Sequence, residues 1–150
     1  MGLIDDTSSS SIGIDTSVFI YFIEEHPDYL PIIQPLFDSV ATGHRTAVTS
    51  ALTLLEVLVV PYRAGNLDLV RRYEALLTRS RGLHLVDLGR EQLRFAAHLR
   101  AVHRVVRTPD ALQLAAALTG RCSTFVTNDR QLPEIPGLRI LQLGDYLASR

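Results

Sequence analysis

Short, nearly continuous apolar runs alternate along the chain with longer segments in which apolar residues recur at helical spacing. The short runs are bounded by polar or turn residues, as is typical of buried strands; they lie at 12–14, 47–49, 83–88, 123–126 and 138–143. The longer segments predict helices at 18–25, 28–42, 51–64, 67–77, 91–104 and 108–119, with a final helical turn at 145–148. This alternation predicts an α/β sandwich around a central, mostly parallel sheet flanked by helices.

Two of the expected helices carry further detail. Residues 18–25 fit either a helix or a longer strand, because their apolar run is poorly periodic. A cap at Thr16 or Ser17 and the closing pair of glutamates favour the helix. In the helix at 91–104 the pattern predicts that the arginines face the solvent. The four residues predicted to face the core are Leu93, Ala96, Ala97 and Leu99.

The stretch from Arg107 to Arg130 joins a capped helix to the strand that follows it. Thr108 fits the N-cap and Pro109 the first helical position, so Asp110 stands in the first turn, near the positive end of the helix dipole. Asp129 comes just past the carboxyl end of the strand. Because ligands bind at that edge of open α/β sheets, this unit brings two acids towards one functional edge.

Length and composition predict a single domain over residues 12–150, preceded by a flexible lead-in over residues 1–11. The chain has 150 residues, one cysteine and a net charge of −1, which predicts a soluble, cytoplasmic protein without disulfides. We expect no signal peptide, and no apolar run is long enough to span a membrane.

Charge is distributed unevenly along the chain. Ten of the fifteen arginines and four of the sixteen acidic residues lie between Pro61 and Pro109, so this window carries a formal charge of +6 and the rest carries −7. A basic middle segment fits a phosphate-binding surface, although a solvated helical face is its commoner explanation. Lysine is absent from the chain, which excludes any mechanism that needs a catalytic lysine.

Four acidic residues are candidates for chemistry, and three of them also have ordinary structural explanations. Asp15 fits an N-cap, Asp110 a first-turn acid stabilised by the helix dipole, and Asp129 a turn residue. Glu56 differs, because it is the only charged residue in the apolar stretch 47–60 and lies inside a helix. A buried carboxylate without a partner is costly, so Glu56 requires an arginine, a hydrogen bond or a metal ion.

If the strands are parallel neighbours, all four acids converge on one edge of the sheet. Carboxylates that share a small site need protons or cations to compensate their repulsion. Hard oxygen ligands favour Mg²⁺ or Mn²⁺, which keep water molecules and bind substrate phosphate. The pattern therefore predicts metal-activated water attacking a phosphodiester bond.

The acids stand in four ordered motifs between Ile12 and Leu147: Ile14-Asp15-Thr16-Ser17, Leu54-Leu55-Glu56-Val57, Thr108-Pro109-Asp110-Ala111-Leu112 and Thr127-Asn128-Asp129-Arg130. In these motifs the chain resembles the PIN-domain ribonucleases and, more narrowly, the VapC-type toxins of toxin–antitoxin pairs. The lead-in before the first strand is longer than is usual in that family.

The resemblance implies a PIN-like α/β/α sandwich and a Mg²⁺- or Mn²⁺-dependent endoribonuclease that is usually a homodimer. It implies that a cognate antitoxin inhibits the enzyme by threading a segment across the active-site groove. The catalytic and metal-binding quartet would be Asp15, Glu56, Asp110 and Asp129. Groups that support the metal and its waters would be Ser17, Thr127 and Asn128.

Other functions remain open from the residues alone. The main alternative is a catalytically inactive member of the same fold that binds RNA or protein, against which the retention of all four acids argues. A second is a phosphohydrolase with Asp15 as nucleophile, but Ser17 replaces the second acid that such enzymes carry. Because no aromatic platform for stacking bases is evident, we expect arginines such as Arg94 and Arg104 to bind RNA through its phosphates.

Overall fold

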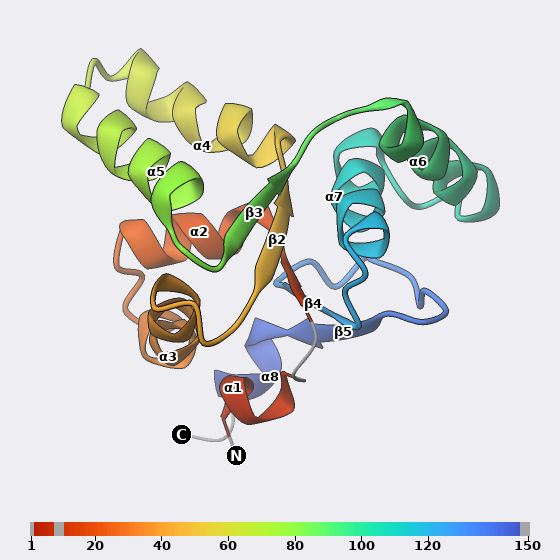
Figure 1. Ribbon diagram of the computed structural model, residues 1–150, viewed down its shortest axis with the longest axis horizontal. Helices are drawn as coiled ribbons and strands as arrows, with labels where there is room; N and C mark the ends of the chain where they lie inside the picture. The colour runs from red at the N-terminus through yellow and green to blue at the C-terminus, as the bar shows by residue number, and fades with distance from the viewer. Residues whose placement is uncertain (1, 8–10, 148–150) are drawn as a thin grey trace.

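A computed structural model describes residues 2–7 and 11–147, and its centre is a five-stranded parallel sheet (Figure 1). The strands follow the order β3-β2-β1-β4-β5 across the sheet, and every neighbouring pair is parallel. Their bounds are Ile12–Ile14 for β1, Ala47–Ser50 for β2, Leu83–Val86 for β3, Thr124–Thr127 for β4 and Arg139–Gln142 for β5. The predicted α/β/α arrangement around a parallel sheet is confirmed.

Helices cover both faces of the sheet. One layer contains α2 (Thr16–Ile23), α3 (Leu30–Ala41), α4 (Leu52–Arg63) and α5 (Leu67–Arg79). The other contains α6 (Arg90–Val102) and α7 (Thr108–Thr119). Residues 16–23 are helical, so the helix interpretation of this region holds and the strand alternative is wrong. The final helix, α8 (Leu143–Leu147), begins two residues earlier than expected, and residue 148 lies outside the described part.

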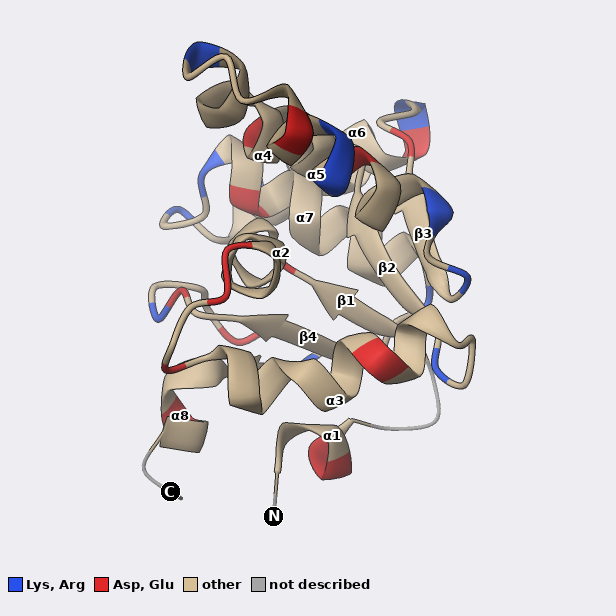
Figure 2. Cartoon of the chain, turned by 90° about the vertical axis from the view of Figure 1, so that its left-hand side faces the viewer, with Lys and Arg blue, Asp and Glu red and all other residues tan. Residues whose placement is uncertain are grey.

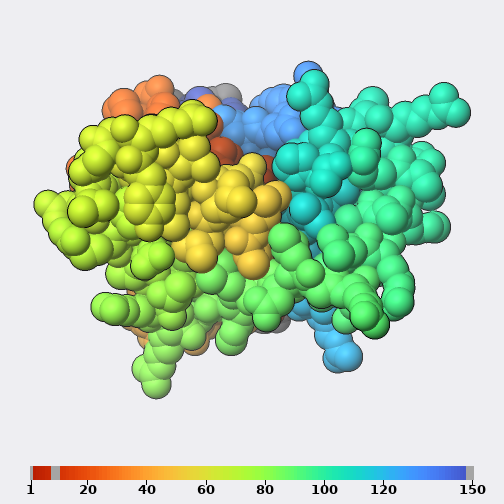
Figure 3. Space-filling view, turned by 90° about the horizontal axis from the view of Figure 1, so that it is seen from above, coloured from red at the N-terminus to blue at the C-terminus, as the bar shows by residue number. Residues whose placement is uncertain are grey.

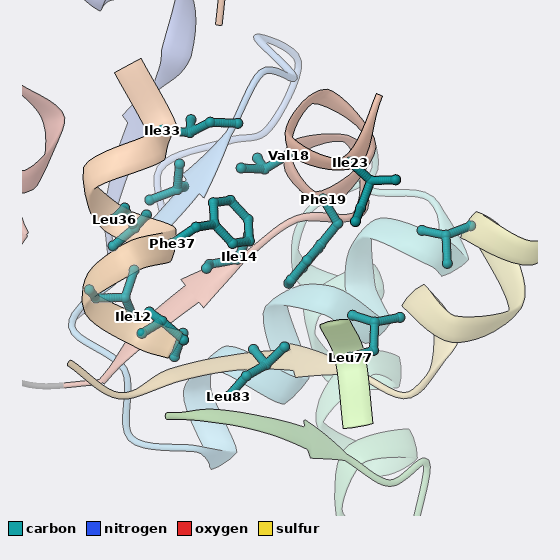
Figure 4. Packing of buried hydrophobic residues seen from close by; sticks show 14 of the residues in the cluster. Ile12, Ile14, Val18, Phe19, Ile23, Ile33, Leu36, Phe37, Leu77 and Leu83 are labelled. Atoms are coloured by element: carbon teal, nitrogen blue, oxygen red, sulfur yellow. The ribbon is translucent and has the colours of Figure 1, made fainter. Parts of the chain in front are cut away.

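Two apolar clusters hold the layers together, one on each face of the sheet. In the larger, α2 and α3 pack onto β1, with Phe37 edge-on to Phe19 (Figure 4). Phe37 also stacks on Phe22. In the smaller, α7 lies directly on the sheet, and seven consecutive residues from Ala111 to Ala117 are buried. The prediction that this apolar run forms a helix buried on most sides is thus confirmed.

Close approach of α7 to β1 explains the glycine in the shortest strand. A Cβ atom built on Gly13 would lie 2.7 Å from the Phe125 ring and 2.8 Å from the Ala117 methyl group. Both distances are shorter than van der Waals contact allows, so a larger residue would separate α7 or β4 from β1. Only glycine lets β1 lie this close to α7, which carries Asp110, and to β4, which Asp129 follows.

Part of the lead-in packs against the domain, and the flexibility expected for residues 1–11 stays a prediction. Leu3–Asp6 form a short helix, α1, and Leu3 is buried against the larger core cluster. Figure 2 shows α1 beside α3. The buried side chain of Leu3 anchors the segment; residues 1 and 8–10 lie outside the described part.

The inward face predicted for α6 is also narrower than the pattern suggested. Ala96 and Leu99 are buried, as expected, but Ala97 is exposed and Leu93 is 50% exposed. The reason is that α6 packs on α7 and not on the sheet, so only one stripe of its surface is covered. Within the described residues, no helix has the length and apolar content to span a membrane.

Candidate active site

The candidate site lies where the strand order changes direction. From β1 the chain proceeds to β2 and β3 on one side, then crosses to β4 and β5 on the other. Ligand crevices in open α/β sheets form at such switch points, outside the carboxyl ends of the strands. Viewed onto this edge, Figure 3 shows the surface hollowed between α4 with α5 (yellow to yellow-green) and α7 (cyan-green).

A pocket of about 560 Å³ occupies this edge, and all four predicted acids line it. Ser17 and Asn128 also line it, whereas Thr127 lies buried behind it. The complete lining is Asp15, Thr16, Ser17, Ile20, Tyr21, Glu56, Pro109, Asp110, Gln113, Asn128 and Asp129. Four segments that are far apart in the sequence therefore bring their acids into one cavity.

Asp15 serves as a helix cap and as a pocket carboxylate at the same time. Its Oδ1 accepts a hydrogen bond from the Thr16 backbone N–H at 2.9 Å, which makes Asp15 the N-cap of α2. Its Oδ2 accepts from the Thr127 hydroxyl at 2.7 Å. Of the caps that the sequence offered for this helix, Asp15 is therefore the one observed, and not Thr16 or Ser17. Two donors from different elements fix the orientation of this carboxylate.

Burial raises the pKa of Asp15, and the nearby Asp110 and Glu56 charges raise it further, against the lowering effect of the hydrogen bonds from Thr127 and Thr16. Burial likewise raises the pKa of Asp110, with a contribution in the same direction from Asp129, whereas Arg107 lowers it. Both shifts disfavour negative charge on these carboxyl groups. A cation beside these groups would reverse that effect, because it favours the ionised form.

Asp110 stands in the first turn of α7, but the cap differs from the prediction. The helix starts at Thr108 after Arg107 as N-cap, and Pro109 takes the second helical position. Proline still fits, because the first turn leaves backbone N–H groups without helical partners. Asp110 therefore reaches the pocket from the positive end of α7.

Glu56 is partly buried, and its partner is a hydroxyl group. The Thr16 hydroxyl donates to Glu56 Oε1 at 2.8 Å. No arginine partner is needed, because this hydrogen bond and the open side of the pocket both relieve the charge. Glu56 therefore faces the pocket and not the core.

Behind Glu56 lies a buried polar network that the sequence did not reveal. Gln113 Nε2 donates to the Thr16 hydroxyl at 3.0 Å and to the Thr53 hydroxyl at 2.7 Å. Gln113 Oε1 accepts from the Ser50 backbone N–H at 3.3 Å. The Thr49 hydroxyl lies 2.7 Å from that of Thr53 and donates to the Ile14 carbonyl at 2.8 Å. The network joins α7, α2, α4 and β2 directly beneath the acids.

The sequence offered one signal for this network, a glutamine inside an otherwise apolar helix. Gln113 is only 3% exposed. A buried amide is costly unless it is hydrogen-bonded, so its position among buried residues implies partners. Which threonines supply them depends on the strand order, and the sequence pattern alone does not give that order.

Asp129 follows β4 through a tight turn. Its backbone N–H donates to the Thr127 hydroxyl at 3.1 Å, and its Oδ1 accepts from the Gln131 N–H at 2.9 Å. Asn128 Nδ2 donates to the hydroxyl groups of Tyr21 at 3.2 Å and Tyr29 at 3.1 Å. The Asn128 amide nitrogen is thus engaged by aromatic residues, a contact that the sequence did not predict.

The oxygen donors suit a hydrated divalent cation. Within residues 2–7 and 11–147, no three His, Cys, Asp or Glu side chains are close enough to hold a metal ion directly. Mg²⁺ commonly binds through one or two carboxylates while it keeps several waters. Carboxylates spaced around an open pocket, two of them with raised pKa, therefore fit such an ion. Arg94 on α6 and Arg104 in the following loop are exposed and do not line this pocket.

A doubly wound parallel sheet with an acidic pocket at its switch point defines a class of α/β protein, and the family comparison narrows it. The PIN domain profile matches residues 12–138, and the chain belongs to the PIN domain family. No protein with curated annotation matches it in sequence.

Solved structures of toxin–antitoxin systems share the fold. VapBC2 from Rickettsia felis bound to a promoter DNA fragment matches with a TM-score of 0.67 at 19% identity, over 88% of this chain and 98% of that one. DNA-bound VapBC from Salmonella typhimurium matches with a TM-score of 0.62 at 23% identity, over 91% of this chain and 99% of that one. VapC20 from Mycobacterium tuberculosis is a toxin that cleaves the sarcin–ricin loop. It matches with a TM-score of 0.61 at 15% identity, over 77% of this chain and 87% of that one.

Proposed function

We propose that this protein is a Mg²⁺- or Mn²⁺-dependent endoribonuclease toxin of the VapC type that hydrolyses phosphodiester bonds in RNA. The observation that carries the proposal is the joint presence of Asp15, Glu56, Asp110 and Asp129 in one pocket of a PIN-domain fold. The similarity of the fold to a toxin that cleaves the sarcin–ricin loop supports it.

In this proposal the four carboxylates would hold the metal ion, directly or through bound waters, and the ion would supply an activated water and stabilise the leaving oxygen. The chain orients these carboxylates in advance. Thr127 and the Thr16 N–H fix the Asp15 carboxylate, and the Thr16 hydroxyl fixes Glu56. Ser17 and Asn128 add polar groups to the wall of the pocket. Such pre-orientation lowers the reorganisation required when negative charge develops on the phosphate.

The same proposal includes the partners of the enzyme. A cognate antitoxin would hold the toxin inactive, which the toxin–antitoxin complexes among the structural neighbours support. We further propose a homodimer that acts in the cytoplasm. Light scattering of the purified chain, alone and after addition of the protein encoded beside it, tests both assemblies.

Cleavage of a mixed RNA pool by the purified protein tests the activity. We expect endonucleolytic products with Mg²⁺ or Mn²⁺ and none with EDTA. Asp110→Asn should reduce the cleavage rate at least about 100-fold, because the metal stabilises the transition state by several kcal/mol. Asp38→Asn is the matched control, since Asp38 is exposed on α3 outside the pocket and its loss should leave the rate unchanged.

Cleavage that persists in EDTA and in Asp110→Asn would overturn the proposed mechanism. If no RNA is cut, titration of Mn²⁺ by calorimetry decides between the two functions. A protein that binds RNA but neither cleaves it nor binds Mn²⁺ would be the inactive, binding-only member of the fold.

A further inference from the structure

Three aromatic side chains form a cluster at the edge of the acidic pocket. Tyr21 and Tyr29 stack with ring centroids 4.7 Å apart and an interplanar angle of 29°. His26 lies against both rings, with centroids 5.0 Å from Tyr21 and 4.7 Å from Tyr29. All three side chains are partly exposed, and Tyr21 itself lines the pocket. The sequence showed no aromatic platform, because these residues are spread over nine positions across a turn.

A tight turn between α2 and α3 brings the rings together. Glu25 adopts a left-handed backbone with φ of 53°, which reverses the chain after α2. The His26 N–H then donates to the Tyr21 carbonyl at 2.9 Å, and the Leu30 N–H donates to the His26 carbonyl at 2.9 Å. The hydrogen bond between Leu30 and His26 brings Tyr29 against Tyr21 just before α3 begins. Backbone hydrogen bonds therefore fix the cluster.

Asn128 connects this cluster to the acids. Its amide nitrogen donates to both phenolic oxygens, and it directly precedes Asp129 on the same turn after β4. The rings are therefore held at a set position relative to the carboxylates. Tyr21 and Tyr29 are partly buried and pack against the larger core cluster, and Tyr21 also lines the pocket. One part of the Tyr21 side chain thus contacts the core while another part reaches the pocket.

We propose that Tyr21, supported by Tyr29 and His26, is a stacking subsite for an unpaired nucleobase of the RNA substrate. The proposal rests on the proposed function, since it assumes that RNA phosphates approach the acids. Aromatic side chains in single-strand-binding proteins stack on bases irrespective of sequence, because every base has a π face. A base on Tyr21 would hold the adjoining phosphate beside Asp15 and Asp129, which line the same pocket.

The test compares Tyr21→Leu with Tyr62→Leu on a short single-stranded RNA. Leucine keeps an apolar side chain but removes the aromatic face, and Tyr62 is an exposed tyrosine on α4 outside the pocket. We expect Tyr21→Leu to raise KM about tenfold or more, within the range known for base–aromatic stacking, with little change in kcat. Tyr62→Leu should leave both constants unchanged. Thermal unfolding of both variants checks that they fold.

An abasic oligomer of the same length separates stacking from a purely structural role. In the Asp110→Asn background, which prevents cleavage, we expect RNA with bases to bind more tightly than the abasic chain, and Tyr21→Leu to remove most of that difference. Tyr29→Leu should act in the same direction if Tyr21→Leu fails to fold. Tyr21→Phe keeps the ring and should keep the preference.

Failure of this inference is distinguishable from failure of the proposed function. A wild-type protein that cleaves RNA, together with Tyr21→Leu at wild-type KM and unchanged preference for bases, overturns the stacking subsite alone. A wild-type protein that neither binds nor cleaves single-stranded RNA overturns the proposed function and the subsite with it.

Discussion

At the scale of single residues, Asp15 shows how one side chain fulfils a structural and a chemical requirement together. It caps α2 with one carboxylate oxygen and receives the Thr127 hydroxyl with the other. Its ordinary explanation as an N-cap is therefore correct and does not compete with a role in the pocket. The cost is electrostatic, because burial and neighbouring acids raise the pKa of this group.

The raised pKa of Asp15 makes a prediction for stability in metal-free buffer. A carboxyl whose pKa is higher in the folded than in the unfolded state binds more protons when folded, so it stabilises the fold as pH falls through the raised pKa. We expect the difference in free energy of unfolding, wild type minus Asp15→Asn, to become more favourable to wild type as the pH is lowered from 7. Urea unfolding with EDTA at several pH values measures it. A difference that is constant with pH would contradict the shift.

At the scale of helices and strands, Gln113 is the residue that connects the elements beneath the pocket. From α7 it donates to hydroxyl groups on α2 and α4 and accepts from the backbone of β2. Removing one partner of a buried hydrogen-bonded group leaves the others unsatisfied, which costs more than the bond itself contributes.

Gln113→Met tests this connection, since methionine has a similar length but no polar group. We expect the free energy of unfolding to fall by about 2–3 kcal/mol, because buried polar partners on three elements lose a hydrogen bond. Gln131→Met is the control; Gln131 is exposed, so its substitution should change stability by less than about 0.5 kcal/mol. Chemical denaturation of both variants gives the comparison, and equal stabilities would show that the network contributes little.

These elements also show what the sequence could and could not predict. Apolar periodicity predicted the parallel sheet and its helices, and it placed acids after β1 and β4, because both signals are local along the chain. The partners of Gln113 and the pairing of Tyr21 with Tyr29 depend on tertiary contacts between segments, which no periodicity records. The exposure of Leu93 has the same origin, because the pattern shows that α6 has an apolar side but not how much of it a neighbour covers.

At the scale of the whole molecule, charge is arranged around the pocket. The arginine-rich window between Pro61 and Pro109 runs from the end of α4 through α5, β3 and α6 to the start of α7. Within it, α5 packs beside α4 and α6 beside α7, on either side of the hollow in Figure 3. An acidic pocket between basic flanks suits a polyanion whose backbone is held at the sides while one phosphate enters the centre.

The salt dependence of RNA binding tests whether these arginines contact phosphates. Each phosphate contact releases counterions, so log Kobs falls with log salt by about 0.7 per contact on a single strand. We expect Arg94→Gln and Arg104→Gln each to weaken binding of single-stranded RNA similarly across sequences and to reduce the steepness of the slope by roughly that amount. Fluorescence anisotropy in the Asp110→Asn background at several salt concentrations measures the slope without cleavage.

Arg71→Gln is the control for these two variants. Because Arg71 already forms an ion pair with Asp68, the loss of Arg71 should change the slope less. A slope that is the same in wild type, Arg94→Gln and Arg104→Gln would mean that these arginines serve only as a solvated helical surface, and the RNA would then be held mainly at the pocket and the aromatic cluster.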